Sequence, residues 1–148
     1  MPAESEPPEL GRVIGGKYRI DALLGRGGMG AVYAATNELT GKRVAVKRLL
    51  PAKSEDPNAA ARFLREARIA ARVEHPNVIN VFDVGRDDDT SIFLVMELLD
   101  GTPLSALIRE GGMEIERLID ILLLVMRGVQ HAHDAGVVHR DLKPANLF

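Results

Sequence analysis

Three polar side chains near the carboxyl end of the chain have the types and spacing needed to transfer a phosphoryl group. The segment His139-Arg-Asp-Leu-Lys-Pro-Ala-Asn146 places Asp141 five residues before Asn146, with Lys143 between them. A carboxylate such as that of Asp141 can accept the proton of an attacking hydroxyl. The amide oxygen of Asn146 suits a hard cation such as Mg²⁺, and Lys143 can neutralise charge on a transferred phosphate. Because eight residues in this order rarely arise by chance, we interpret the segment as a catalytic loop.

A glycine cluster near the amino end suits phosphate binding. Residues 25–32 read Gly-Arg-Gly-Gly-Met-Gly-Ala-Val, which matches the spacing G-x-G-x-x-G-x-V. Glycine carries no Cβ, so its backbone N–H groups can approach phosphate oxygens closely. Dinucleotide-binding folds show the same spacing, but there a helix opens at the last glycines. Here we expect a strand at Ala31–Ala35, so the loop joins two antiparallel strands. From this motif alone, a flexible hairpin without a ligand remains an alternative.

Two charged side chains fall on surfaces that the sequence pattern makes apolar. Lys47 shares a face of an expected strand, Arg43–Leu50, with Ala45. Glu66 falls within the apolar stripe of an expected helix, Asn58–Val73. An unpaired carboxylate in such a stripe would be costly, by several kcal/mol as an order of magnitude. We therefore predict that Glu66 pairs with Lys47 and orients it toward a nucleotide phosphate, although an edge-exposed Glu66 remains the simpler alternative.

Short strands and two long helices are expected to position these residues. The expected strands are Tyr18–Leu24, Ala31–Ala35, Arg43–Leu50, Asn80–Gly85 and Ser91–Met96, and the expected helices are Asn58–Val73 and Glu114–Ala135. Residues 1–16 are expected to form a disordered leader, because residues 2–9 read Pro-Ala-Glu-Ser-Glu-Pro-Pro-Glu and have no apolar period. His131 and His133 are two residues apart, which puts them on different faces of a helix, so we interpret them as helix-end residues and not as a metal site.

The composition excludes several classes of protein. The chain has 148 residues, a formal net charge of −2 and no Cys, which excludes a disulfide framework and a thiolate metal site. A balanced charge gives no reason to expect nucleic acid as a partner. The apolar run Ile121–Met126 is far shorter than the ~20 residues of a membrane-spanning helix, and no signal peptide is evident. We expect a cytoplasmic placement; the oligomeric state is left open by the sequence.

Taken together, the motifs resemble those of eukaryotic-like protein kinases, and most closely the bacterial serine/threonine type. The resemblance covers residues 18–148 and implies an α+β fold. In that fold an antiparallel sheet and one key helix form an N-terminal lobe, residues 17–99 including the hinge. Residues 100–148 would begin a helical C-terminal lobe. The implied activity is transfer of the ATP γ-phosphate to Ser or Thr hydroxyls of protein substrates, with Mg²⁺ as cofactor.

The resemblance also implies a role for individual residues. Lys47 would hold the α- and β-phosphates with Glu66 as its helix partner, Asp141 would be the catalytic base, Lys143 the γ-phosphate contact and Asn146 a Mg²⁺ ligand. The ATP-binding residues would be Leu24, Gly25, Gly27, Gly28, Gly30, Val32, Ala45, Lys47, Met96, Glu97 and Leu99. Among these, Met96 matches the gatekeeper, and Glu97 and Leu99 match the hinge. Arg140 matches the arginine that reads a phosphorylated activation loop.

One departure from the family pattern keeps two other functions open. The family continues into an Asp-Phe-Gly motif, an activation loop and an Ala-Pro-Glu motif, none of which occurs in residues 1–148. We therefore expect a kinase domain that is truncated after its catalytic loop. The alternatives are a nucleotide-binding pseudokinase and a non-catalytic interaction fragment. Nucleotide binding would separate the last of these from the others, and phosphotransfer would separate kinase from pseudokinase.

Overall fold

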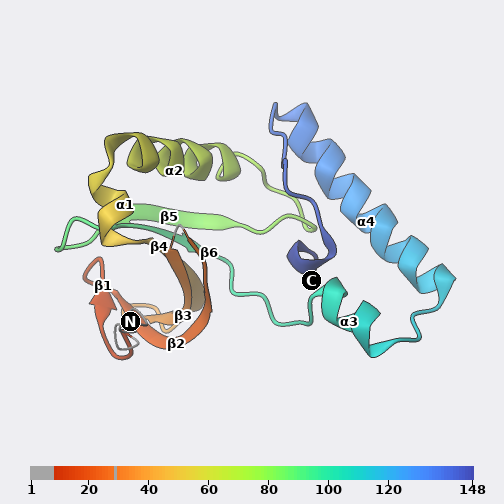
Figure 1. Cartoon of the computed structure of the whole chain (residues 1–148), viewed down its shortest axis with the longest axis horizontal. Helices are drawn as coiled ribbons and strands as arrows, with labels where there is room; N and C mark the ends of the chain where they lie inside the picture. The colour runs from red at the N-terminus through yellow and green to blue at the C-terminus, as the bar shows by residue number, and fades with distance from the viewer. Residues whose placement is uncertain (1–8, 29) are drawn as a thin grey trace, which may run out of the picture. The chain divides into compact units, whose positions relative to one another are not determined.

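Six antiparallel strands form one sheet in the computed structural model, which describes residues 9–28 and 30–148 (Figure 1). The order of strands across the sheet is β1-β2-β3-β4-β6-β5. Their bounds are β1 Val13–Ile14, β2 Tyr18–Arg26, β3 Gly30–Asn37, β4 Arg43–Leu49, β5 Val81–Arg86 and β6 Ile92–Met96. The five strands expected from the sequence are therefore present, each with ends that differ by no more than a few residues.

Alternation along the strands gives the sheet two different faces. In β4, Val44 and Val46 belong to a buried cluster that also includes Tyr33 of β3 and Phe93 of β6. On the opposite face, Leu49 packs with Ala60 and Phe63 of the helix α2, Pro57–Ala70, and with Ile92. Successive strand residues point to opposite faces, so Lys47 lies on the same face as Leu49. The helix side of the sheet is thus also the side that carries Lys47.

Four α-helices and one short 3₁₀ helix complete the described chain. They are α1 Pro51–Glu55, α2 Pro57–Ala70, α3 Leu104–Glu110, α4 Ile115–Asp134 and the 3₁₀ helix η1 Pro144–Asn146. The expected helix Asn58–Val73 corresponds to α2, which ends earlier, because Arg72 and Val73 donate to carbonyls only three residues back. Many apolar residues of α4 remain exposed, among them Ile115, Ile119, Leu122, Leu123, Leu124 and Met126. In the part of the chain that the structure describes, no helix has the length and apolar character of a membrane span.

The disordered leader was expected to cover residues 1–16, and this range is too long. Residues 1–8 lie outside the described part, but residues 9–16 have a defined fold: β1 pairs with β2 through Val13–Arg19 and Ile14–Tyr18. Ile14 is fully buried in the apolar cluster of the sheet, which explains why this segment is held. The leader prediction failed because the Pro- and Glu-rich composition of residues 2–9 was extended to a neighbouring segment that contains Val13 and Ile14.

The chain forms two compact units. The first runs through Ala67 and includes Val81–Leu98, so it contains the whole sheet with α1 and most of α2. The second consists of Arg68–Asn80 and Leu99–Phe148, so it contains α3, α4, η1 and the loop that follows α2. Within the second unit, Gly128 of α4 is buried against the main chain of Asn77 in that loop.

Candidate active site

The glycine cluster is a tight hairpin between β2 and β3. Gly25 pairs with Val32, and the N–H groups of Gly27 and Gly30 donate to each other's carbonyls over 2.9 and 3.3 Å. A Cβ at Gly30 would collide with the carbonyl oxygen of Arg48, so this position requires glycine. A strand follows the last glycine, as expected, which excludes the helix of a dinucleotide-binding fold. The surface beside the hairpin is open, because a Cβ would meet no atom within 4 Å at the other glycines, Gly25, Gly27 and Gly28.

Lys47 lies in the middle of the sheet, opposite the returning strand of the hairpin. Its cross-strand neighbours are Val32 of β3 and Leu94 of β6. The ammonium nitrogen is 5.9 Å from the ring centroid of Phe63, which belongs to α2. Lys47 is therefore only partly exposed, and its charged end is directed toward the helix side of the sheet.

The expected ion pair between Lys47 and Glu66 is not formed. Among the described residues, no carboxylate lies within 4.0 Å of the Lys47 ammonium, and Glu66 is exposed. The assignment of Glu66 to the apolar stripe of α2 was therefore wrong, whereas Phe63 and Ala67 are buried as that stripe requires. A position at the edge of the stripe lets the carboxylate remain hydrated, which is cheaper than unpaired burial. The role of Glu66 as a partner of Lys47 stays a prediction.

Three residues expected around adenine lie on the sheet at different depths. Ala45 of β4 pairs with Met96, the last residue of β6, and is 5% exposed. Val32 is partly buried. Leu24 of β2 is more than half exposed, at 54%. The apolar surface expected for adenine thus has a buried floor at Ala45 and an exposed edge at Leu24.

The two residues expected in the hinge come directly after the sheet. Glu97 follows the end of β6, and Leu99 is the first residue of the segment that belongs to the second unit. The boundary between the two compact units therefore falls within the expected hinge. Contacts of Glu97 and Leu99 to a nucleotide stay predictions.

The catalytic-loop residues of the second unit contact one another. The Lys143 ammonium lies 3.2 Å from the Asp141 carboxylate. The side-chain amide of Asn146 donates to the main-chain oxygen of Asp141 over 2.9 Å and approaches its carboxylate at 3.3 Å. The N–H of Asp141 donates to Nδ1 of His139 over 3.2 Å. The three residues singled out from the sequence are thus brought together in one loop.

This arrangement favours the ionised form of the Asp141 carboxyl. The hydrogen bond and charge of Lys143 lower the pKa of the Asp141 carboxyl below its ordinary value. An ionised carboxylate is the form that can accept a proton from a hydroxyl. An Asp carboxyl with its ordinary pKa is already ionised at neutral pH, and the contact with Lys143 extends this ionised state to lower pH.

Backbone geometry holds the catalytic loop in shape. Arg140, directly before Asp141, has a φ of 67°, a left-handed conformation that is uncommon for a residue with a side chain. At the end of the loop, the carbonyl of Leu147 accepts a hydrogen bond of 2.8 Å from the N–H of Leu104. The loop is therefore tied to the start of α3.

Oxygen atoms suitable for Mg²⁺ are present but few. The Asn146 amide uses its NH₂ group on Asp141, which leaves its side-chain oxygen as an acceptor. Mg²⁺ prefers oxygen ligands and keeps several waters, so one protein oxygen from Asn146 is compatible with a partial site. In residues 9–28 and 30–148, no group of three or more His, Cys, Asp or Glu could hold a metal ion.

One group of charged residues in the first unit was missed. Arg48 follows Lys47 and is 6% exposed, yet the sequence interpretation assigned it no role. The signal was available, because the alternation that puts Val44 and Val46 on the buried face also puts Arg48 there. A buried arginine requires carboxylate partners, and three carboxylates contact Arg48.

Comparison with known proteins agrees with the fold and with the motifs. A family model described as "Protein kinase domain" matches residues 18–148. The chain is 42% identical over 141 residues to a probable serine/threonine-protein kinase of Streptomyces coelicolor. It is 40% identical over 146 residues to serine/threonine-protein kinase PknA of Mycobacterium tuberculosis. These matches cover 93% and 95% of the chain but only 21% and 34% of the two relatives.

Solved structures show the same relationship. The crystal structure of the M. tuberculosis PknI kinase domain matches with a TM-score of 0.77 and 29% sequence identity. The match covers 92% of the chain and 55% of that kinase domain. These matches, together with the antiparallel sheet and its glycine hairpin, show the class of protein. The chain belongs to the protein kinase family, and the relatives named above are bacterial serine/threonine kinases.

Proposed function

We propose that the protein containing this chain is an ATP-dependent serine/threonine protein kinase. The observation that carries the proposal is the contact network of the catalytic loop, in which Lys143 and Asn146 both bind Asp141. The Leu-Lys-Pro sequence that follows Asp141 resembles the serine/threonine subclass. Protein substrates with Ser or Thr are accordingly the proposed partners, and the cytoplasm is the proposed location of the kinase portion.

Each residue of the loop has a definite task in the proposed reaction. Asp141 accepts the proton of the substrate hydroxyl while the hydroxyl oxygen forms a bond to the γ-phosphorus. The bond between that phosphorus and the β–γ bridging oxygen breaks, and ADP leaves. Lys143 offsets negative charge on the transferred group. Asn146 would supply an oxygen to Mg²⁺, which when bound would neutralise charge on the phosphates.

The first unit would bind the nucleotide. The glycine hairpin presents an open surface at Gly25, Gly27 and Gly28, and Lys47 offers one ammonium on the helix side of the sheet. Val32 and Ala45 lie on that same side and provide apolar contact for adenine. These roles come from the family resemblance, and the positions of the residues on the sheet support them.

A phosphotransfer assay tests the proposal, with a variant that lacks the proposed catalytic base as the control. The complete protein is incubated with labelled Mg·ATP and a generic protein substrate, in parallel with an Asp141→Asn variant. We expect label on Ser or Thr from the unaltered protein and a loss of at least about 100-fold in the variant. Equal label from both proteins would contradict the assignment of Asp141.

A second candidate is a nucleotide-binding pseudokinase. It is favoured by one observation, namely that Lys47 has no carboxylate within 4.0 Å in the described residues. ATP binding that depends on Lys47, without any transfer of label by the complete protein, would support this candidate over the kinase.

A further inference from the structure

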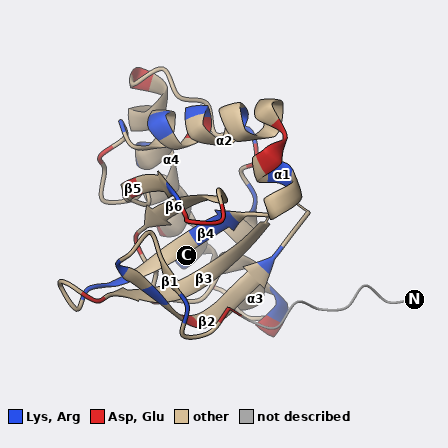
Figure 2. Ribbon diagram, turned by 90° about the vertical axis from the view of Figure 1, so that its left-hand side faces the viewer, with Lys and Arg blue, Asp and Glu red and all other residues tan. Residues whose placement is uncertain are grey.

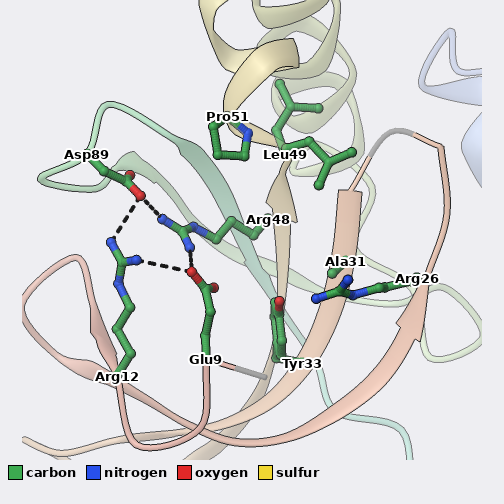
Figure 3. Close-up of a pocket in the computed structure, with 10 residues that line it drawn as sticks. Glu9, Arg12, Arg26, Ala31, Tyr33, Arg48, Leu49, Pro51 and Asp89 are labelled. Carbon is green, nitrogen blue, oxygen red and sulfur yellow. Dashed lines mark hydrogen bonds and ion pairs between the residues drawn. The ribbon is translucent and has the colours of Figure 1, made fainter. Parts of the chain in front are cut away.

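Five charged side chains form a cluster on the sheet face opposite Lys47. The N-terminal segment supplies Glu9 and Arg12, β4 supplies Arg48, and the β5–β6 turn supplies Asp87 and Asp89; we call this set the Arg48 cluster. Figure 3 shows four of its members, all except Asp87, along one side of a pocket of about 230 Å³. Figure 2 shows the acidic β5–β6 turn beside the basic end of β4.

The cluster joins three separate segments by direct contacts. Arg12 binds Asp87 at 2.8 Å, Asp89 at 3.0 Å and Glu9 at 3.0 Å. Arg48 binds Asp87 at 3.3 Å and also pairs with Glu9 and with Asp89. The N-terminal segment is therefore bound to β4 and to the β5–β6 turn by both arginines.

Two of the charged side chains in the Arg48 cluster are buried, so their contacts matter for stability. The Arg48 side chain is 7% exposed and that of Asp87 is 3% exposed. A charge removed from water depends on its partners, and loss of one partner leaves an uncompensated charge. Glu9 supplies one of the three carboxylates that contact Arg48, and Arg12 contacts the same three carboxylates.

The position of Arg48 matters because of its neighbours along and across the chain. It follows Lys47 directly, and its main chain pairs with Ala31 in the strand that returns from the glycine hairpin. Its carbonyl oxygen also lies so close to Gly30 that no side chain fits there. A shift of Arg48 would therefore move Lys47 and Gly30, which belong to the two elements expected to contact phosphate.

The N-terminal part of the cluster lies outside the family match. That match begins at residue 18, whereas Glu9 and Arg12 precede it. We propose that residues 9–17 are a positioning element of this kinase: through Glu9 and Arg12 they fix Arg48, and through it they hold Lys47 and the glycine hairpin in the geometry that binds nucleotide phosphates. This inference rests on the proposed function.

Phosphate-specific binding distinguishes this role from a general contribution to folding. Affinities for ATP and for adenosine are measured by calorimetry on the complete protein and on Glu9→Gln and Asp89→Asn variants. We expect ATP affinity to fall by about three- to tenfold, as for the loss of one charged hydrogen bond or less. Adenosine affinity should stay within about twofold, because adenosine has no phosphate for Lys47 or the hairpin to bind.

A matched control uses Arg19 of β2, whose ion-pair partners lie outside the Arg48 cluster. Arg19 binds Asp21 at 3.2 Å and Glu38 at 3.6 Å, so Arg19→Gln removes exposed ion pairs without touching the Arg48 cluster. Its ATP and adenosine affinities should both remain unchanged. Unchanged ATP affinity in Glu9→Gln and Asp89→Asn, or a parallel loss of ATP and adenosine affinity, would overturn the positioning role.

Failure of the proposed function would give a different result. If the unaltered protein bound ATP no better than a Lys47→Met variant, the nucleotide site itself would be refuted, and the positioning role with it. If ATP binding depended on Lys47 but was unaffected by both cluster variants, only the positioning role would be refuted.

Discussion

The side-chain amide of Asn146 donates a hydrogen bond to the main-chain oxygen of Asp141, 2.9 Å away. One residue thus does two things: its NH₂ group fixes the backbone of the expected base, and its oxygen is left for a cation. Aspartate at position 146 would retain an oxygen ligand but lose the donor, and it would place a second carboxylate beside Asp141. Substitutions at this position can therefore separate the two tasks.

We predict that Asn146→Asp lowers kcat of the complete protein by about 100-fold or more, since it perturbs both the base and the metal ligand. Steady-state phosphotransfer at several Mg²⁺ concentrations is the measurement. Asn58→Asp, at an exposed position in the first turn of α2, is the control and should have little effect. A kcat within about twofold of the unaltered protein would show that Asn146 does not position Asp141.

Lys47→Met should abolish phosphotransfer and leave the fold largely intact. Lys47 forms no ion pair within the described residues, so its removal costs little stability, about 1 kcal/mol or less. Denaturant unfolding and phosphotransfer are measured together. Lys53→Met, at an exposed lysine of α1, is the matched control and should keep full activity. Activity retained by the Lys47 variant would remove this lysine from the site.

Glu66→Ala tests whether an ion pair forms in the working enzyme. Because Glu66 is exposed and unpaired with Lys47 here, we expect its removal to change the unfolding free energy by no more than about 0.5 kcal/mol. Phosphotransfer should nevertheless fall by at least about tenfold, if Glu66 orients Lys47 during turnover as the family resemblance implies. Activity equal to that of a Glu55→Ala control would refute the pairing.

The Arg48 cluster should make stability depend on pH in the acid range. Burial alone would raise the pKa of Asp89, but hydrogen bonds from Ser91 and Arg48 outweigh it and hold the pKa well below the ordinary value of 3.8. A carboxyl with a depressed folded-state pKa contributes stability above its unfolded-state pKa, and this contribution is lost as the pH falls toward the folded-state value.

We therefore expect the unfolding free energy to decrease as the pH falls below about 5, and to decrease less steeply in Asp89→Asn. Urea unfolding at a series of pH values is the measurement. Asp88→Asn alters an exposed neighbour in the same turn and should leave the slope unchanged. Identical slopes for Asp89→Asn and the unaltered protein would contradict the assignment.

The exposed apolar residues of α4 predict self-association of residues 1–148 when they are produced alone. Leu123 and Met126 are 48% and 64% exposed, beside other apolar side chains of the same helix. Surfaces of this kind favour aggregation. Leu123→Lys should increase the monomer fraction in analytical ultracentrifugation, whereas Arg127→Lys should not.

The strands and long helices could be predicted because their periodicity is strong over many residues. The elements that were missed are short: β1 has two residues and α1 has five. The helix α3 could have been found, since Pro103 precedes it and Gly111, with a φ of 76°, ends it. Its seven residues were too few for a convincing apolar period.

The sequence predicted the catalytic loop better than the surroundings of Lys47. Asp141, Lys143 and Asn146 are close in sequence, so a local turn is enough to bring them together. The pairing of Lys47 with Glu66 depends on how a helix lies on a sheet, and residue spacing does not determine that distance. In the Arg48 cluster, Arg48 contacts residues that are 39 and 41 positions away in the sequence. No local sequence pattern reveals such contacts.

At position 128 of α4, an isolated helix would favour alanine, whereas the folded protein favours glycine. A Cβ at this buried position would come 3.1 Å from the carbonyl oxygen of Asn77 and 3.2 Å from Val78. Glycine inside a helix costs about 1 kcal/mol relative to alanine. A peptide of α4 should therefore become more helical with alanine at this position, while the folded protein should become less stable because the loop at Asn77 is pushed away. The effect of this substitution on stability would thus have opposite signs in the peptide and in the folded protein. In the protein, close packing against the loop outweighs the intrinsic preference of the helix for alanine.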